Sequence, residues 1–171
     1  MKKNLVLTGM MGVGKSTVGK NLAQKLSYNF VDIDRTIESR EGSTINLIFK
    51  NKSESYFRKL ENEISLEKLK KKNTVISLGG GAFLNKSIRR EVKNTSVSFW
   101  LDVDVSELIK RLKKTKKRPL LYNKNLNVTV NKIYLERKKT YSEADFRIKC
   151  NFLGPDKIVD KILKLYEKSG N

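Results

Sequence analysis

The chain has 171 residues, which is the length of a single domain with a buried core. Its formal net charge of +19 produces a positive electrostatic field that attracts anions. It contains no histidine, which excludes mechanisms that need a Ser–His pair, a Cys–His pair or a histidine metal ligand. Its single cysteine excludes an internal disulfide, and no run of about eighteen apolar residues predicts a membrane span, so we expect a cytoplasmic protein without a secretion signal.

Five apolar segments of strand length alternate with longer charged segments that have helical spacing. Alternating strands and helices are typical of a parallel sheet with helices on its faces. The sequence contains no internal repeat and no linker, so residues 1–171 are predicted to form one domain. The predicted strands are Asn4–Thr8, Phe30–Ile33, Thr74–Leu78, Val97–Leu101 and Phe146–Cys150.

The first predicted strand leads directly into Gly9–Ser16, which fits the phosphate-loop template G-x-x-x-x-G-K-[ST] and precedes a helical segment. Glycines let successive backbone N–H groups point at phosphate oxygens, and the helix adds its positive N-terminal end. Lys15 is expected to contact the β and γ phosphates of a nucleotide, and Ser16 to offer a hydroxyl ligand to Mg²⁺. The expected nucleotide-binding residues of this segment are Gly12, Val13, Gly14, Lys15, Ser16 and Thr17.

Two carboxylates, Asp32 and Asp34, stand at the end of the second predicted strand. Their spacing gives them the same side-chain parity, at the edge of a parallel sheet where ligands bind. One could face magnesium and the other an acceptor, while a helix cap is the alternative explanation.

Three glycines, Gly79–Gly81, follow the third predicted strand. Such a run allows another group to approach the backbone closely, and a flexible turn is the alternative.

These motifs and four further segments resemble the shikimate kinase family in order and spacing, from Leu5 to about Ile162. The resemblance implies an α/β fold, namely a three-layer P-loop kinase with a five-stranded parallel sheet in order 2-3-1-4-5 flanked by helices. It also implies a shikimate-binding helical segment at about 33–61 and a mobile lid at about 113–127, although the basic 113–127 stretch could equally be an exposed loop. The further segments are Ile48-Phe49, Phe57–Glu61, Arg118–Leu121, and Arg137 ahead of Tyr141–Asp145.

The resemblance also implies a reaction: Mg²⁺-dependent transfer of the γ-phosphate of ATP to the 3-hydroxyl of shikimate. The products would be shikimate 3-phosphate and ADP, in aromatic amino-acid (chorismate) biosynthesis. Lys15 resembles the family's phosphate lysine, and Asp34 the residue that binds the shikimate hydroxyls and orients or deprotonates the attacking one. Arg118 resembles the lid arginine that reaches the transferred phosphate, and Arg111 and Pro155 resemble residues that flank adenine.

The ligand-holding residues follow from the same resemblance. Ser16 and Asp32 would hold one Mg²⁺ per subunit, with Asp32 acting through water. Arg58 and Arg137 would grip the shikimate carboxylate beside the backbone of Gly79, Gly80 and Gly81, in a pocket that Phe49 and Phe57 line. Each assignment has an alternative: ion pairs with acidic residues three and four positions away for Arg58, a solvated helix face for Arg137, and the core for the two phenylalanines.

Two other functions stay open from the residues alone. Another small-molecule kinase of this fold, acting on gluconate or a nucleoside monophosphate, shares the phosphate loop. The high positive charge makes a P-loop regulatory or nucleic-acid-binding ATPase a second alternative. Against it, the lysines are scattered through the sequence instead of forming one stripe. We therefore expect ATP and shikimate as partners, no specific nucleic acid, no membrane, and a monomer.

Overall fold

The computed structural model describes residues 3–113 and 125–170. Its centre is a five-stranded sheet in the order β2-β3-β1-β4-β5, and every neighbouring pair of strands is parallel. The predicted order 2-3-1-4-5 is therefore confirmed, and the predicted strands agree with the structure to within one residue at each end. The strands are β1 (Asn4–Thr8), β2 (Asn29–Asp32), β3 (Thr74–Ser77), β4 (Ser96–Asp102) and β5 (Phe146–Lys149).

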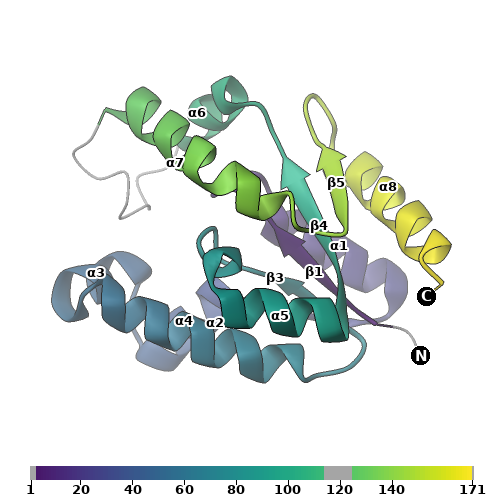
Figure 1. Ribbon diagram of the computed structural model, residues 1–171, viewed down its shortest axis with the longest axis horizontal. Coiled ribbons are helices and arrows are strands. Elements are labelled where there is room, and N and C mark those ends of the chain that lie inside the picture. The colour runs from purple at the N-terminus through teal and green to yellow at the C-terminus, as the bar shows by residue number, and fades with distance from the viewer. Residues whose placement is uncertain (1–2, 114–124, 171) are drawn as a thin grey trace.

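Helices cover both faces of this sheet and give the predicted three layers. In Figure 1, α1 lies behind the sheet, where it contacts α8, and α5 crosses in front of it. The helix bounds are α1 (Lys15–Leu26), α2 (Ile33–Glu41), α3 (Ile45–Lys52), α4 (Glu54–Leu69), α5 (Lys86–Thr95), α6 (Val105–Lys113), α7 (Leu126–Tyr141) and α8 (Pro155–Lys168), with a short 3-10 helix η1 (Ala82–Leu84). None of the helices in the described part of the chain combines the length and the apolar character that a membrane crossing needs.

The burial of the strands explains why their sequences are apolar runs. Every residue of the central strands β1 and β4 is buried, because helices cover both of their faces. The edge strands β2 and β5 are partly exposed and carry more polar residues. The parallel pairing brings the carboxyl ends of β1, β2 and β3 to one edge of the sheet, which is where the phosphate loop begins.

The end of the second strand differs from the prediction. The strand stops at Asp32, and Ile33 begins α2, so Asp34 lies in the first helical turn and not on the strand. Asp32 is the N-cap of this helix, and its carboxylate accepts a hydrogen bond from the Arg35 N–H at 3.2 Å. The parity argument for the two carboxylates is therefore wrong, because capping of the backbone N–H groups ended the strand one residue earlier. The cap that was the alternative explanation is present.

Candidate active site

The phosphate loop has the backbone conformation that only glycine adopts easily. Gly9, Gly12 and Gly14 have φ angles of +133°, +81° and +98°. A Cβ atom at Gly9 would lie 2.4 Å from the Leu101 carbonyl oxygen of the neighbouring strand, so a side chain has no room there. The loop joins β1 to α1, which confirms the strand–loop–helix context that the motif requires.

Lys15 and Ser16 lie at the start of α1 and face into this loop. The Lys15 side chain is buried, and its Nζ donates hydrogen bonds to the carbonyl oxygens of Gly9 at 2.9 Å and Met10 at 3.0 Å. The Ser16 hydroxyl donates to the Asp32 carboxylate at 2.5 Å. A pocket at this point has walls formed by Gly12, Gly14, Lys15, Ser16, Thr17, Asp32 and Asp34, among others.

The remaining nucleotide-site predictions are only partly covered. Val13 is buried, and its carbonyl oxygen accepts a hydrogen bond from Arg111 Nη1 at 3.4 Å, so Arg111 reaches the phosphate loop. Pro155 is the exposed first residue of α8, and its place beside adenine stays a prediction. Arg118 and most of the predicted lid lie outside the described residues.

The oxygen pair of Ser16 and Asp32 fits a magnesium ion. Mg²⁺ prefers hard oxygen ligands, and it usually takes one or two from the protein and the rest from water and substrate phosphates. A hydroxyl and a carboxylate within 2.5 Å of each other beside the phosphate loop are such a pair. No group of three or more His, Cys, Asp or Glu side chains that could hold a metal by itself is found among residues 3–113 and 125–170.

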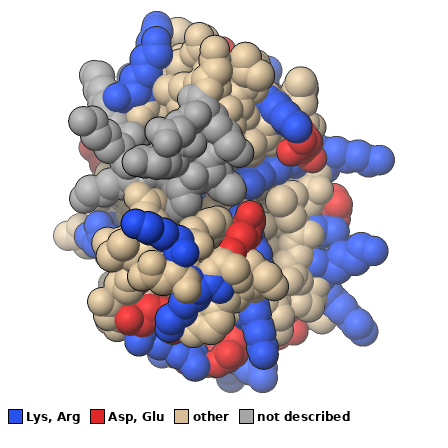
Figure 2. Space-filling view, turned by 90° about the vertical axis from the view of Figure 1, so that its left-hand side faces the viewer, with Lys and Arg blue, Asp and Glu red and all other residues tan. Residues whose placement is uncertain are grey.

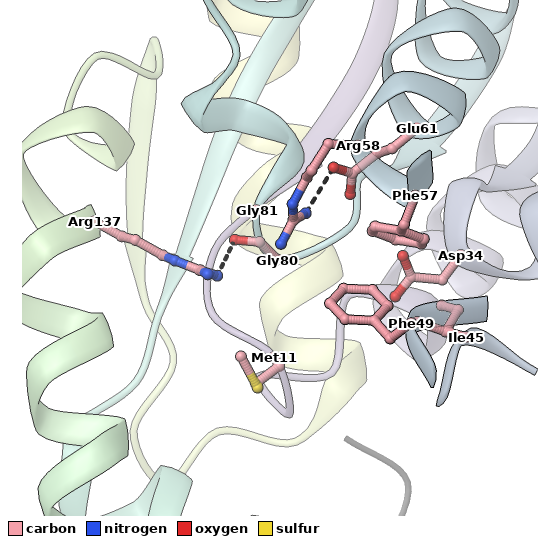
Figure 3. Close-up of a pocket in the computed structure, with 10 residues that line it drawn as sticks. All are labelled: Met11, Asp34, Ile45, Phe49, Phe57, Arg58, Glu61, Gly80, Gly81 and Arg137. Atoms are coloured by element: carbon pink, nitrogen blue, oxygen red, sulfur yellow. Dashed lines mark hydrogen bonds and ion pairs between the residues drawn. The ribbon is translucent and has the colours of Figure 1, made fainter. Parts of the chain in front are cut away.

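A second pocket adjoins the first and brings together side chains from four helices (Figure 3). Seven of the eight predicted substrate-binding residues line it, and Gly79 does not. Three lining residues were not predicted, namely Met11, Ile45 and Glu61. The predicted residues are Asp34, Phe49, Phe57, Arg58, Gly80, Gly81 and Arg137.

The apolar wall of this second pocket is an aromatic pair. The rings of Phe49 and Phe57 lie 4.9 Å apart at a tilt of 48°. Phe57 is buried and Phe49 half-buried, so both residues belong to the core and to the pocket at once. The Arg58 guanidinium lies 5.1 Å from the Phe57 ring centre, which places the cation over an aromatic face.

Arg58 is held by two acidic residues of its own helix. Its Nη1 donates to Glu61 Oε2 at 2.7 Å, and its Nη2 donates to Glu54 Oε1 at 3.1 Å. The predicted ion pairs therefore exist, and they hold the guanidinium at the pocket instead of on an open surface. Glu61 is buried, and desolvation raises its pKa although Arg58 opposes the shift. Its Oε1 has no hydrogen-bond partner within the described ranges.

The glycines after β3 are explained by close approach of side chains. A Cβ at Gly79 would lie 2.4 Å from Glu61 Oε1 and 2.7 Å from Asp34 Oδ1. A Cβ at Gly81 would lie 2.5 Å from Arg58 Nη1. Neither glycine has a positive φ angle, so space and not backbone strain is what a side chain here would violate.

Arg137 reaches the same pocket from α7. It is buried, with 7% of its surface exposed, so the solvated helix face proposed as the alternative does not apply. Its Nη1 donates to the Gly80 carbonyl oxygen at 2.7 Å, as Figure 3 shows. Asp34, Met11 and Gly80 line both pockets, so the two cavities meet at these residues.

Comparison with known proteins relates this geometry to one family. The sequence profile described as shikimate kinase matches residues 11–167. A shikimate kinase of Persephonella marina is 43% identical over 161 residues, which cover 94% of this chain and 97% of the relative. One of Thermodesulfovibrio yellowstonii is 39% identical over 169 residues, covering 99% and 98%.

Solved structures give the same family and separate it from another kinase of the same fold. A shikimate kinase from Acinetobacter baumannii in complex with shikimate superposes with a TM-score of 0.94 at 33% identity, covering 98% of this chain and 94% of the other. A gluconokinase from Sinorhizobium meliloti reaches a TM-score of 0.61 at 16% identity, covering 98% and 93%, and that likeness shows the fold alone. The chain belongs to the shikimate kinase family.

Proposed function

We propose that this chain transfers the γ-phosphate of ATP to the 3-hydroxyl of shikimate, giving shikimate 3-phosphate and ADP. The observation that carries the proposal is the junction of the two pockets at Asp34, Met11 and Gly80. An acceptor hydroxyl at Asp34 would face the phosphate loop directly. Phosphoryl transfer depends on positioning and charge stabilisation more than on covalent help from the protein, and a shared boundary between two pockets supplies the positioning.

The second pocket has the chemistry to hold a cyclic hydroxy acid. Arg58 and Arg137 can each offer two parallel N–H donors to a carboxylate, which an ammonium cannot do. The faces of Phe49 and Phe57 suit the apolar side of a small ring. The Asp34 carboxylate is an acceptor for hydroxyl groups at the end of the pocket next to the phosphate loop.

The first pocket has the chemistry to hold a triphosphate. Lys15 supplies a charge for the β and γ phosphates, and the glycine-lined loop supplies backbone N–H donors. Ser16 and Asp32 would hold Mg²⁺, which when bound neutralises charge between those phosphates. In the transfer, the acceptor oxygen forms a bond to the γ-phosphorus, the bond to the β–γ bridging oxygen breaks, and Asp34 takes the hydroxyl proton.

Several parts of the proposal rest on family resemblance. These are the single Mg²⁺ per subunit, the lid at about 113–127 and the phosphate contact of Arg118. The monomeric state and the cytoplasmic location remain expectations from the sequence.

An acceptor screen tests the proposal. ADP release would be measured in a coupled assay with shikimate, quinate, gluconate and nucleoside monophosphates at equal concentrations. Shikimate should give the highest kcat/KM, and its methyl ester should be a poor substitute. Arg58→Ala should discriminate less against the ester than the wild type does, because the partner charge is already gone. A preference for gluconate or a nucleotide, or equal rates for acid and ester, would contradict the proposal.

A further inference from the structure

The Gly80 carbonyl oxygen is held by two side chains of the same helix. Arg137 Nη1 donates to it at 2.7 Å, and the Tyr141 hydroxyl donates to the same oxygen from one helical turn further along α7. Residues four positions apart lie on one face of a helix, so both donors point at the loop after β3. Of these two residues, only the arginine lines the acceptor pocket.

Tyr141 is fixed in this position by its surroundings. Its side chain is fully buried, and its ring lies 5.9 Å from that of Trp100 at a tilt of 34°. Its hydroxyl also neighbours the Met10 sulfur at 3.9 Å, which is a weak partner, and the Arg137 guanidinium, whose charge and hydrogen bond lower the pKa of Tyr141 against the larger effect of burial. Burial raises the pKa of Tyr141, so the hydroxyl keeps its proton and remains a donor. The Gly80 carbonyl is therefore the strong hydrogen-bond partner of this buried hydroxyl.

The same peptide group presents its other side away from α7. The described residues contain no cis peptide bond, so the carbonyl of Gly80 and the N–H of Gly81 point in opposite directions. Within residues 3–113 and 125–170, the N–H groups of Gly80 and Gly81 have no intramolecular hydrogen bond. Both glycines line the acceptor pocket, so these N–H groups are donors available to a bound acceptor.

We propose that Tyr141 is a positioning residue of the acceptor site: its hydroxyl holds the Gly80 carbonyl, and this aligns both the Arg137 guanidinium and the Gly81 N–H. The inference rests on the function proposed above. When Arg137 turns donors toward an acceptor carboxylate, the Tyr141 hydroxyl keeps the Gly80 carbonyl paired. Without that hydroxyl, Arg137 would be the carbonyl's remaining partner, and each shift of the guanidinium toward the acceptor would weaken that bond.

Another buried tyrosine provides a matched control. The Tyr166 hydroxyl donates to the Lys3 carbonyl oxygen at 2.5 Å, and its side chain is 2% exposed. Tyr166 lies on α8 and lines neither of the two pockets. Tyr141→Phe and Tyr166→Phe thus each remove one buried hydroxyl-to-carbonyl bond, but only the first bond touches the acceptor site.

Steady-state kinetics test the proposal through a split between KM and kcat. Tyr141→Phe should raise the KM for shikimate about 3- to 10-fold, the effect expected from one hydrogen bond. The KM for ATP should stay unchanged, and kcat should change less than about twofold. Tyr166→Phe should leave all three parameters unchanged. If Tyr141→Phe lowers the melting temperature as Tyr166→Phe does but leaves the KM for shikimate unchanged, Tyr141 has only a structural role.

Nuclear magnetic resonance follows the peptide group itself and needs no activity. Gly80 and Gly81 are the only glycines preceded by glycine, so protein labelled with glycine carrying carbon-13 at its carbonyl and nitrogen-15 gives two carbonyl–amide correlations. The correlation of the Gly80 carbonyl with the Gly81 N–H should move when shikimate is added to wild-type protein. It should also move in Tyr141→Phe and stay in place in Tyr166→Phe.

The two measurements separate the failure of this inference from the failure of the proposed function. A wild type that does not phosphorylate shikimate would overturn the proposed function. A wild type that does so, with a Gly80–Gly81 correlation that is insensitive to shikimate, would overturn the role of Tyr141. An insensitive correlation in the wild-type titration overturns the inference even if Tyr141→Phe fails to fold.

Discussion

Asp34 stands at the boundary between the two pockets, in the first turn of α2. Asp34→Asn keeps the shape of the side chain but removes its charge and basicity, so kcat should fall by about 10²- to 10⁴-fold. The KM for ATP should change little, because Lys15 and the loop backbone are left intact. Kinetics with each substrate varied in turn measure both effects, with the exposed Asp160→Asn as control.

One outcome would contradict the role of Asp34 at the acceptor hydroxyl. If Asp34→Asn lost affinity for ATP and kept its affinity for shikimate, the carboxylate would belong to the nucleotide site.

Glu61 makes a pH-dependent contribution to stability. Burial raises its pKa above the ordinary value of 4.5 in the folded protein. The native state therefore binds more protons than the unfolded state in the window above 4.5, and stability from this group is lost as the pH rises through the folded pKa. Glu61→Gln removes this dependence of the free energy of unfolding on pH. The free energy of unfolding of the variant minus that of wild type should rise with pH from 4.5 toward neutrality.

Urea unfolding at a series of pH values measures this difference. Glu63→Gln, on the same helix but exposed, serves as the control. A difference for Glu61→Gln that is flat across the window would show that Arg58 fully compensates the burial of the carboxylate.

At the scale of elements, the loop after β3 affects acceptor binding because its glycines leave room for the side chains that line the pocket. Gly81 has φ −106° and ψ −13°, which alanine adopts without strain. The three atoms nearest to a Cβ there belong to the guanidinium of Arg58, the movable end of a flexible side chain. Because Arg58 Nη1 also donates to the buried Glu61, Gly81→Ala should lower the melting temperature, and the KM for shikimate should rise about tenfold or more as Arg58 is displaced.

Thermal unfolding and steady-state kinetics measure the two effects. Gly154→Ala is the matched control, because a Cβ at Gly154 meets nothing within 4 Å and φ is −70°. It should leave the KM for shikimate unchanged. A loss of stability in Gly81→Ala without a rise in the KM for shikimate would mean that Arg58 keeps its place in the acceptor site.

The sequence predicts the elements that local pattern defines. The strands β1 and β4 are apolar runs because both of their faces are buried, and the phosphate loop is recognisable because its glycines and Lys15 stand in a fixed order. The end of β2 is one residue off because an aspartate suits a strand end and a helix cap equally well. Sequence reasoning named Glu61 only as an ion-pair partner of Arg58 and missed Met11 and Ile45, because only the packing of α3, α4 and the phosphate loop makes these residues pocket walls.

The contact between Tyr141 and Gly80 is one that local pattern cannot supply. Tyr141 and Gly80 are 61 positions apart, and only the order of the sheet brings α7 beside the loop after β3.

At the scale of the whole molecule, the positive charge is spread and not gathered. Figure 2 shows lysine and arginine side chains at separate places on the visible face, mainly in its lower half and along its right-hand edge, with acidic residues among them. This distribution suits weak, salt-sensitive attraction of anions better than a specific nucleic-acid site, whose absence stays a prediction.

Global stability can be followed through Cys150. The side chain is 1% exposed, and burial raises the pKa of the thiol to about 11. Native protein should therefore react with a thiol reagent at neutral pH at least about 10³-fold more slowly than urea-unfolded protein, because the thiol must first be exposed. The rate of thiol labelling measures this. Equal rates in native and unfolded protein would show that β5 opens freely.

Trp100 packs against Tyr141 on one side, and the Arg147 guanidinium lies 4.7 Å from its ring centre. It is the only tryptophan in the sequence, and it is buried. Its fluorescence therefore reports on one position in the fold. There Trp100 contacts Tyr141, whose hydroxyl donates to the Gly80 carbonyl beside the acceptor pocket. Trp100 can therefore serve as an intrinsic fluorescent probe. Binding of shikimate to the acceptor pocket should change the tryptophan emission of unlabelled protein, without ATP and without turnover.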